Sequence, residues 1–288
     1  MSPPRLLVVE GNTAEGRAGH AKAGGVAMSE GYARVLRDLL PGAVVDICYP
    51  ADAGANLPDR AGLESYDGVA ITGSALNVYD GGPAVDSQVA LARAVMAART
   101  PVFGSCWGLQ VLTVAAGGSV RKNPKGREIG FARRIRLTQA GRKHPMFERR
   151  RDAFDALTVH LDEVETLPLD TTVLAANAVS DIQAFEIRRD GAVAWGVQYH
   201  PEFSPRDMAV IVRRYGNRLV REGFFADAGD LVAYAADLEL LDREPGNTRL
   251  AWRYGLDGDV LDKDVRLTEI ANWIAHQVLP TRSARGRG

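Results

Sequence analysis

The sequence predicts an α/β fold in which a mostly parallel central sheet carries helices on both faces, followed by a small helical C-terminal extension. Short apolar runs alternate with segments of helical periodicity over the first two-thirds of the chain, which is typical of parallel sheets. After residue 223 the strand pattern ends and two helical segments follow. We therefore divide the chain into a domain of residues 1–223, an extension of residues 224–280 and a tail of residues 281–288.

The parallel half of the sheet is predicted from short apolar runs. Strands that are buried on both faces read as continuous apolar segments instead of alternating ones. Four runs fit this description: residues 6–9, 44–49, 68–72 and 101–104. Apolar residues recur every three or four positions in residues 28–40 and 85–98, so we expect helices there.

A glycine- and alanine-rich stretch, residues 11–25, follows the first strand. It shows no periodicity, so we expect a loop. Active sites of open α/β sheets lie at the carboxyl ends of the strands, and this loop begins at such an end. A lid over the site and a disordered connector are both open as interpretations.

From residue 133 onward, strand-like runs follow one another with few helices between them. These runs are residues 135–137, 172–175, 182–187 and 192–197. Their sequence predicts an antiparallel or mixed continuation of the sheet. Residues 205–221 are expected to form an amphipathic helix, with Met208, Ile211, Val212, Tyr215 and Leu219 on one face.

In the extension we expect helices over residues 230–241 and 267–278, joined by the turn-rich residues 243–262. Its large apolar residues should pack on another surface: Trp252, Tyr254, Ile270, Trp273 and Ile274. We favour packing against the main domain, and a homodimer contact is the alternative. Residues 281–288 hold three Arg and two Gly and are expected to be disordered.

Composition narrows the classes of function. The 35 basic and 36 acidic residues give a net charge of -1, which offers no general attraction to nucleic acid or to an anionic membrane surface. No apolar stretch approaches the length of a membrane helix. Two cysteines are too few for a disulfide framework, so we expect a cytoplasmic protein. No metal or cofactor is expected, and no phosphate-binding glycine loop follows a strand.

Cys106 is the candidate nucleophile. It lies in Gly104-Ser105-Cys106-Trp107-Gly108, between an apolar strand and the start of a helix. The glycines permit a sharp turn that exposes the side chain, and the helix N-terminus favours the thiolate, which is the reactive form. Cys48 lies within a plain strand and is interpreted as structural.

His200 is the candidate base. Among the five histidines, it alone directly follows the carboxyl end of a strand-like run, where open α/β sheets place their sites. Glu202 lies two residues further on and projects to the same side of an extended segment, so it can orient the imidazole. His20, His144 and His276 are interpreted as structural.

Four segments in the right order resemble the class I glutamine amidotransferase family. Two of them are long: Gly104-Ser105-Cys106-Trp107-Gly108-Leu109-Gln110 and Gly196-Val197-Gln198-Tyr199-His200-Pro201-Glu202. Residues 159–168 resemble the intervening His-containing segment, and Ile71-Thr72-Gly73-Ser74 resembles the oxyanion loop. The resemblance covers about residues 5 to 222.

This resemblance implies a flavodoxin-like fold and hydrolysis of the glutamine side-chain amide through a γ-glutamyl thioester, with release of ammonia. It implies that Cys106 attacks, that His200 transfers the proton and that Glu202 orients His200. Backbone N–H groups of Gly73 and Trp107 would form the oxyanion hole. Substrate-binding positions correspond to Gln110, Ser74, Leu161 and Asp162.

Two departures from the family pattern leave the substrate open. Leu161 replaces a common glycine, and Gly73-Ser74-Ala75 replaces a common Gly-Gly-Pro. The segment Gly73-Ser74-Ala75 resembles the branch of GMP synthase glutaminase domains and plant γ-glutamyl peptidases. About 65 residues after Gly223 are too few for a synthetase domain. The chain is therefore expected to supply ammonia to a separate synthetase subunit or to hydrolyse a γ-glutamyl compound alone. A non-catalytic binding protein is the third alternative.

Overall fold

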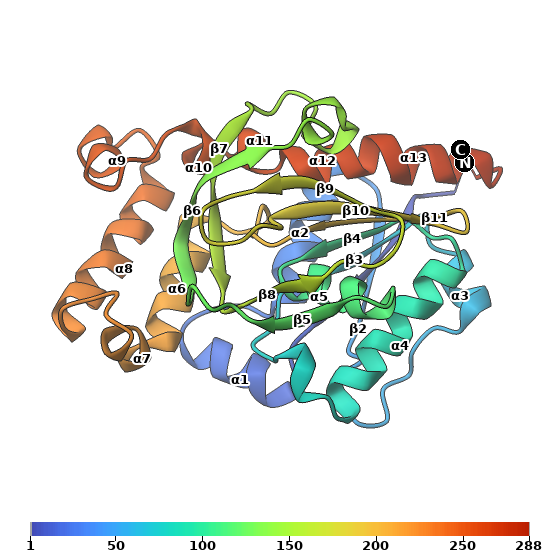
Figure 1. Cartoon of the computed structure of the whole chain (residues 1–288), viewed down its shortest axis with the longest axis horizontal. Coiled ribbons are helices and arrows are strands. Elements are labelled where there is room, and N and C mark those ends of the chain that lie inside the picture. The colour runs from blue at the N-terminus through green and yellow to red at the C-terminus, as the bar shows by residue number, and fades with distance from the viewer. Residues whose placement is uncertain (1, 288) are drawn as a thin grey trace.

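The computed structural model describes residues 2–287 and is built around a nine-stranded sheet (Figure 1). The strand order is β2-β1-β3-β4-β11-β10-β9-β6-β7, and β5 and β8 form a separate pair. The strands are β1 Arg5–Val9, β2 Val44–Cys48, β3 Gly68–Ile71, β4 Val102–Ser105, β5 Ser119–Lys122, β6 Glu128–Leu137, β7 Ala153–His160, β8 Asp162–Thr166, β9 Thr171–Ala176, β10 Ala184–Arg189 and β11 Ala192–Val197.

Strands β2, β1, β3, β4 and β11 are parallel, and β10, β9, β6 and β7 continue the sheet in antiparallel fashion. This confirms the mixed sheet of a flavodoxin-like fold. Because β3, β4 and β11 are parallel neighbours, their carboxyl ends meet at one edge. Segments that are far apart in the chain are thereby brought together at that edge.

Helices cover both faces of the parallel strands. Their bounds are α1 Ala14–Lys22, α2 Met28–Leu39, α3 Arg60–Glu64, α4 Pro83–Ala97, α5 Trp107–Ala115, α6 Pro205–Tyr215, α7 Asn217–Arg221, α8 Ala228–Arg243, α9 Thr248–Tyr254, α10 Gly258–Leu261, α11 Lys263–Arg266, α12 Thr268–Trp273 and α13 Leu279–Ala284. Leu6 and Val8 of β1 share a buried cluster with α2 and α12, while Leu7 and Val9 face α4 and α5. The alternation along one strand shows that each face has its own core.

The C-terminal extension packs against the main domain. Helix α8 shares an apolar cluster with α6, and Trp273 of α12 packs on β3, where a Cβ at Gly68 would come within 2.8 Å of its ring. Arg150 Nε donates to Glu269 Oε1 at 3.0 Å, and both side chains are buried. The expected packing of Trp252 against the main domain is wrong, since this residue of α9 is 85% exposed.

Several expected loops are helical instead. Residues 11–25 contain α1, which Thr13 caps by accepting from the N–H of Gly16, and Arg17 pairs with Asp52 at 2.6 Å. The turn-rich residues 243–262 contain α9 and α10. The helix expected over 205–221 is broken at Gly216, whose φ of 48° ends α6 before α7 begins.

The expected disordered tail is also wrong for the part that the structure describes. Residues 281–284 belong to α13, and Arg285 donates to the carbonyl oxygen of Tyr66 at 2.8 Å. Arg282 contacts the carbonyl of Ser2, so the two ends of the chain lie side by side (Figure 1). Within residues 2–287, no helix combines the length and the apolar character that crossing a membrane requires.

Candidate active site

Cys106 lies in a sharp turn between β4 and α5. Its φ of 51° is in the left-handed region, a strained conformation typical of a nucleophile elbow. The flanking glycines are required by close packing. A Cβ at Gly104 would come within 2.5 Å of the backbone of Gly108, and a Cβ at Gly108 within 2.5 Å of the carbonyl oxygen of Ile71. The turn is anchored where Cys106 N donates to Val197 O at 2.7 Å.

His200 follows β11 and is fixed from several sides. Its Nδ1 lies 2.8 Å from Oε1 of Glu202, and its backbone N–H donates to the carbonyl of Leu157 at 2.8 Å. The ring stacks on Phe203, with centroids 3.9 Å apart and an interplanar angle of 4°. A Cβ at Gly73 would come within 2.5 Å of Cε1 of the ring, so glycine is needed there. Because Nδ1 contacts Glu202, Nε2 is the ring nitrogen that remains available for proton transfer.

The electrostatics favour a charged imidazole beside the sulfur. Burial opposes the charge on His200, but the carboxylate of Glu202 and a hydrogen bond with Cys106 outweigh it and raise the pKa of His200 to about 10. Cys106 Sγ lies 3.5 Å from the carbonyl oxygen of Val159 and is nearly buried. Burial raises the pKa of the Cys48 thiol to about 12, which agrees with a structural role for that residue.

The loop after β3 is pinned in place by hydrogen bonds. Thr72 Oγ1 donates to the carbonyl oxygen of Gly73 at 3.0 Å, and Asn12 Nδ2 approaches the same oxygen at 3.5 Å. Asn12 Oδ1 in turn accepts from the N–H of Ala75 at 3.1 Å. No acceptor within residues 2–287 engages the backbone N–H groups of Gly73 and Ser74. These donors therefore remain free at the edge of the site.

Among the predicted substrate-binding residues, Ser74 lines a hollow beside His200, while polar groups of Gln110, Leu161 and Asp162 are already engaged. Gln110 Nε2 lies 3.5 Å from the carbonyl oxygen of Asp162, and Leu161 O accepts from Asn123 N at 2.9 Å. The Asp162 carboxylate accepts from Tyr79 at 2.8 Å. Burial raises the pKa of Asp162 although that hydrogen bond opposes the effect. A cationic ligand would stabilise this carboxylate.

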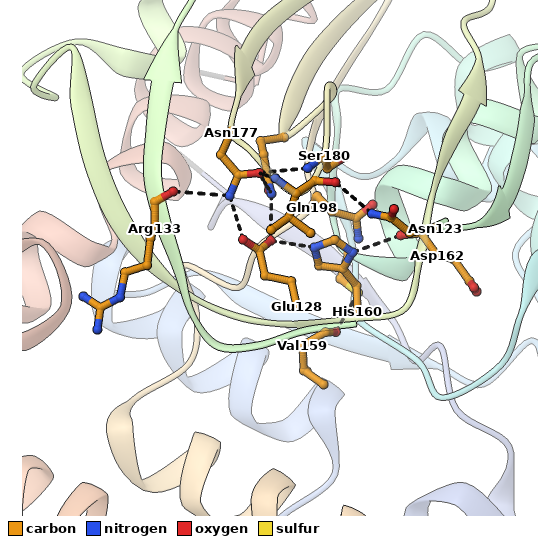
Figure 2. A network of polar contacts seen from close by, with 12 residues as sticks. Asn123, Glu128, Arg133, Val159, His160, Asp162, Asn177, Ser180 and Gln198 are labelled. Atoms are coloured by element: carbon orange, nitrogen blue, oxygen red, sulfur yellow. Dashed lines mark hydrogen bonds and ion pairs between the residues drawn. The ribbon is translucent and has the colours of Figure 1, made fainter. Parts of the chain in front are cut away.

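A buried polar network supports Asp162 from behind (Figure 2). His160 Nδ1 lies 3.0 Å from the Asp162 carbonyl oxygen, and its Nε2 lies 2.8 Å from Glu128. Glu128 also accepts from Asn177 at 2.6 Å and from Gln183 at 2.8 Å. Since both ring nitrogens of His160 face acceptors, the ring is held in one orientation. The network therefore fixes the backbone at the start of β8.

Sequence reasoning missed several residues of the site. Asn12, Tyr79 and Glu128 reach it only through tertiary contacts, and their positions in the chain carry no local signal. Phe203 is the exception that a closer reading could have found, because it directly follows the His-Pro-Glu segment. In the part of the chain that the structure describes, no group of three or more His, Cys, Asp or Glu residues could hold a metal ion.

The sequence and fold of the chain are similar to those of known proteins. A curated relative, gamma-glutamyl-L-1-hydroxyisopropylamide hydrolase from a Pseudomonas species, is 36% identical over 98% of this chain and 95% of its own length. Gamma-glutamyl peptidase 3 from Arabidopsis thaliana is 28% identical over 59% of this chain and 68% of its own.

A solved structure of a glutamine amidotransferase from Thermotoga maritima shares the fold, with a TM-score of 0.64 and 18% identity. The superposition covers 96% of this chain and 98% of that one. Residues 40–215 match the family described as glutamine amidotransferase class-I. The long relative, the family match and the elbow cysteine lead to one conclusion: the chain belongs to the class I glutamine amidotransferase family.

Proposed function

We propose that this protein is a free-standing hydrolase of γ-glutamyl amides, with Cys106, His200 and Glu202 as its catalytic triad. The observation that carries the proposal is the buried row of contacts from the sulfur through the imidazole to the carboxylate. Class I family membership and the similarity to a γ-glutamyl amide hydrolase over nearly the whole chain support it.

Acylation needs only these groups. The thiolate of Cys106 attacks the amide carbon, the C–S bond forms, and the carbonyl oxygen becomes an oxyanion. Backbone N–H groups of Trp107 and Gly73 stabilise that oxyanion, with the N–H of Ser74 as a further donor; one such donor is worth about 3 kcal/mol. When the C–N bond breaks, His200 Nε2 gives its proton to the departing nitrogen. Because the pKa of His200 is about 10, this proton is present at neutral pH.

Deacylation reverses the roles. Neutral His200 takes a proton from water, the resulting hydroxide attacks the thioester carbon, and the C–S bond breaks to release glutamate and the Cys106 thiolate. Glu202 stabilises the imidazolium that is regenerated and keeps Nε2 directed to the sulfur. The reaction consumes one water molecule and needs no further co-reactant.

Recognition of the γ-glutamyl part falls to the residues beside Cys106. We assign the substrate's α-ammonium to the Asp162 carboxylate, which has Tyr79 as a hydrogen-bond donor and benefits from a nearby positive charge. Gln110, Ser74 and the backbone at Leu161 complete this side of the pocket. The Glu128–His160 network holds Asp162 in position for that contact (Figure 2).

The free-standing alternative is favoured over a glutaminase that depends on a synthetase subunit. The loop that carries Gly73 is already pinned by Thr72 and Asn12, so its N–H groups need no partner to order them. The similarity to the long relative also includes the extension, as expected if both proteins work in the same form.

The test is release of amine and ammonia by the isolated protein from γ-glutamyl amides and from L-glutamine. We expect turnover without any partner, and we expect Cys106→Ser and Cys106→Ala to abolish it while the fold is retained in circular dichroism. Turnover that survives in Cys106→Ala contradicts the assignment of the nucleophile. Turnover that is negligible alone and rises on addition of a synthetase subunit favours the partner-dependent alternative.

A further inference from the structure

The position of the leaving amine follows from the proposed function, on which this inference rests. Since His200 must protonate the departing nitrogen, the group attached to that nitrogen lies beside the His200 ring. A hollow opens there, and its lining includes Met28, His200, Phe203, Ile211, Arg214 and Tyr215. It is therefore the subsite for the leaving group.

The walls of this subsite are mostly apolar. Met28 comes from α2, Phe203 stacks on the catalytic imidazole, and Ile211 lies on the buried side of α6. Ammonia offers nothing to such a surface, whereas a carbon-bearing amine gains by burying its apolar part. The lining therefore points to an amide of a substituted amine.

Apart from His200, Arg214 is the charged residue in the lining of the hollow. Its neighbours on the same segment are neutralised: Arg213 pairs with Glu239 at 2.6 Å, and Arg218 pairs with Glu222 at 2.9 Å. No ion pair or hydrogen bond joins the Arg214 side chain to any other residue between 2 and 287, and no acidic residue lines the hollow.

The positive charge of Arg214 acts on the buried side chain of His20. Burial lowers the pKa of His20, and the guanidinium of Arg214 lowers it further. A second hollow is lined by Ala75, Arg214, Tyr215 and Arg218, and it shares the first three of these residues with the subsite. An anionic group placed at the end of the leaving amine would meet Arg214 with no competing carboxylate.

We infer that the leaving amine carries a carboxylate, so that the preferred substrates are γ-glutamyl derivatives of apolar α-amino acids, and that Arg214 binds this carboxylate. The Pseudomonas relative is named for an amide whose leaving amine carries a hydroxyl instead. Arg214 is thus a specificity-determining residue that separates a carboxylate from a hydroxyl at the same position.

A matched series of substrates tests the inference. L-Glutamine and the γ-glutamyl amides of isopropylamine, L-alaninol and L-alanine share the scissile bond, and the last three differ only in a methyl, a hydroxymethyl or a carboxylate group. We expect wild-type kcat/KM to be highest for the alanine derivative. A charged hydrogen bond of this kind is typically worth about ten- to hundredfold over the isopropylamide.

Three variants assign the effect to Arg214. Arg214→Met and Arg214→Gln should lower kcat/KM for γ-glutamyl-L-alanine at least about tenfold and leave the isopropylamide within about threefold. Arg214→Lys keeps the charge but loses the planar fork, so it should show an intermediate loss. Arg213→Met is the matched control, since Arg213 lies one residue away on α6 and pairs with Glu239. It should leave all four substrates within about threefold.

The outcomes separate the inference from the proposed function. Equal wild-type kcat/KM for the alanine and alaninol derivatives overturns the inference, as does an Arg214→Met loss that is the same for all substrates. Either result leaves the hydrolase itself intact. Failure of wild-type protein to cleave any of the four substrates, or cleavage by Cys106→Ala, overturns the proposed function and the inference together.

Discussion

Replacement of Glu202 by Gln tests the electrostatic core of the site. Glu202 Oε1 lies 2.8 Å from His200 Nδ1, and both side chains are buried. The pKa of His200 is about 10 against an ordinary value of 6.5, which corresponds to about 5 kcal/mol in favour of the imidazolium. Burial opposes the positive charge, so the stabilisation of the imidazolium comes from its negative partners Glu202 and Cys106. Replacement by Gln keeps the shape of the side chain but removes the negative charge of residue 202, which is one of these two partners.

In Glu202→Gln the carboxylate that favours the imidazolium is absent, so a smaller fraction of His200 is charged at neutral pH. The amide can also donate to Nδ1, which stabilises the tautomer that has no lone pair facing the sulfur. We expect kcat/KM to fall by about 10³- to 10⁴-fold, as it does when a buried triad carboxylate becomes an amide.

The assay is initial-rate hydrolysis of a chromogenic γ-glutamyl anilide, followed as a function of pH. Asp207→Asn is the matched control, since Asp207 is a neighbouring half-buried carboxylate that caps α6 and does not contact His200. It should stay within about threefold of wild type. A Glu202→Gln protein that folds and retains kcat/KM within the same range would refute the role assigned to Glu202.

Two further predictions concern the thiols and the extension. Iodoacetamide should modify Cys106 but not Cys48, at a rate that changes little between about pH 7 and about pH 9, because His200 stays charged below its pKa of about 10 and burial raises the Cys48 pKa to about 12. Peptide mass spectrometry measures both sites, and equal labelling would contradict the prediction. Glu269→Gln leaves Arg150 buried without its counter-charge and should lower the free energy of unfolding by about 3–5 kcal/mol in urea titrations. A change below about 1 kcal/mol would show that the pair is dispensable.

The parallel half of the fold could be predicted because each of its elements has a strong local pattern. The runs at β1, β3 and β4 are short and continuous, as strands covered on both faces must be. Helix α1 could not be predicted, since glycines and alanines there show no amphipathic pattern. It is stabilised by the cap at Thr13 and by the pairing of Arg17 with Asp52, a contact across 35 positions.

The residues that we propose as a triad could be selected from the sequence because each of them lies in a local pattern. Cys106 lies between two glycines after a strand, and Glu202 lies two residues after His200. The parallel pairing of β4 with β11 then brings these two segments together. Other residues of the site lie in no such local pattern. Asn12, Tyr79 and Arg214 reach the pocket from other elements, and only the folded chain brings them there.

The extension also contributes to the placement of His200. Tyr199 directly precedes His200, and its hydroxyl donates to Glu269 Oε1 at 2.9 Å in the interior. The same carboxylate pairs with Arg150, so α12 is joined to the end of β11 by charge-assisted hydrogen bonds. Loss of α12 would remove the acceptor of Tyr199 and loosen the backbone that carries His200. This coupling gives a physical reason why the likeness to the Pseudomonas hydrolase extends through the extension and does not end with the family domain.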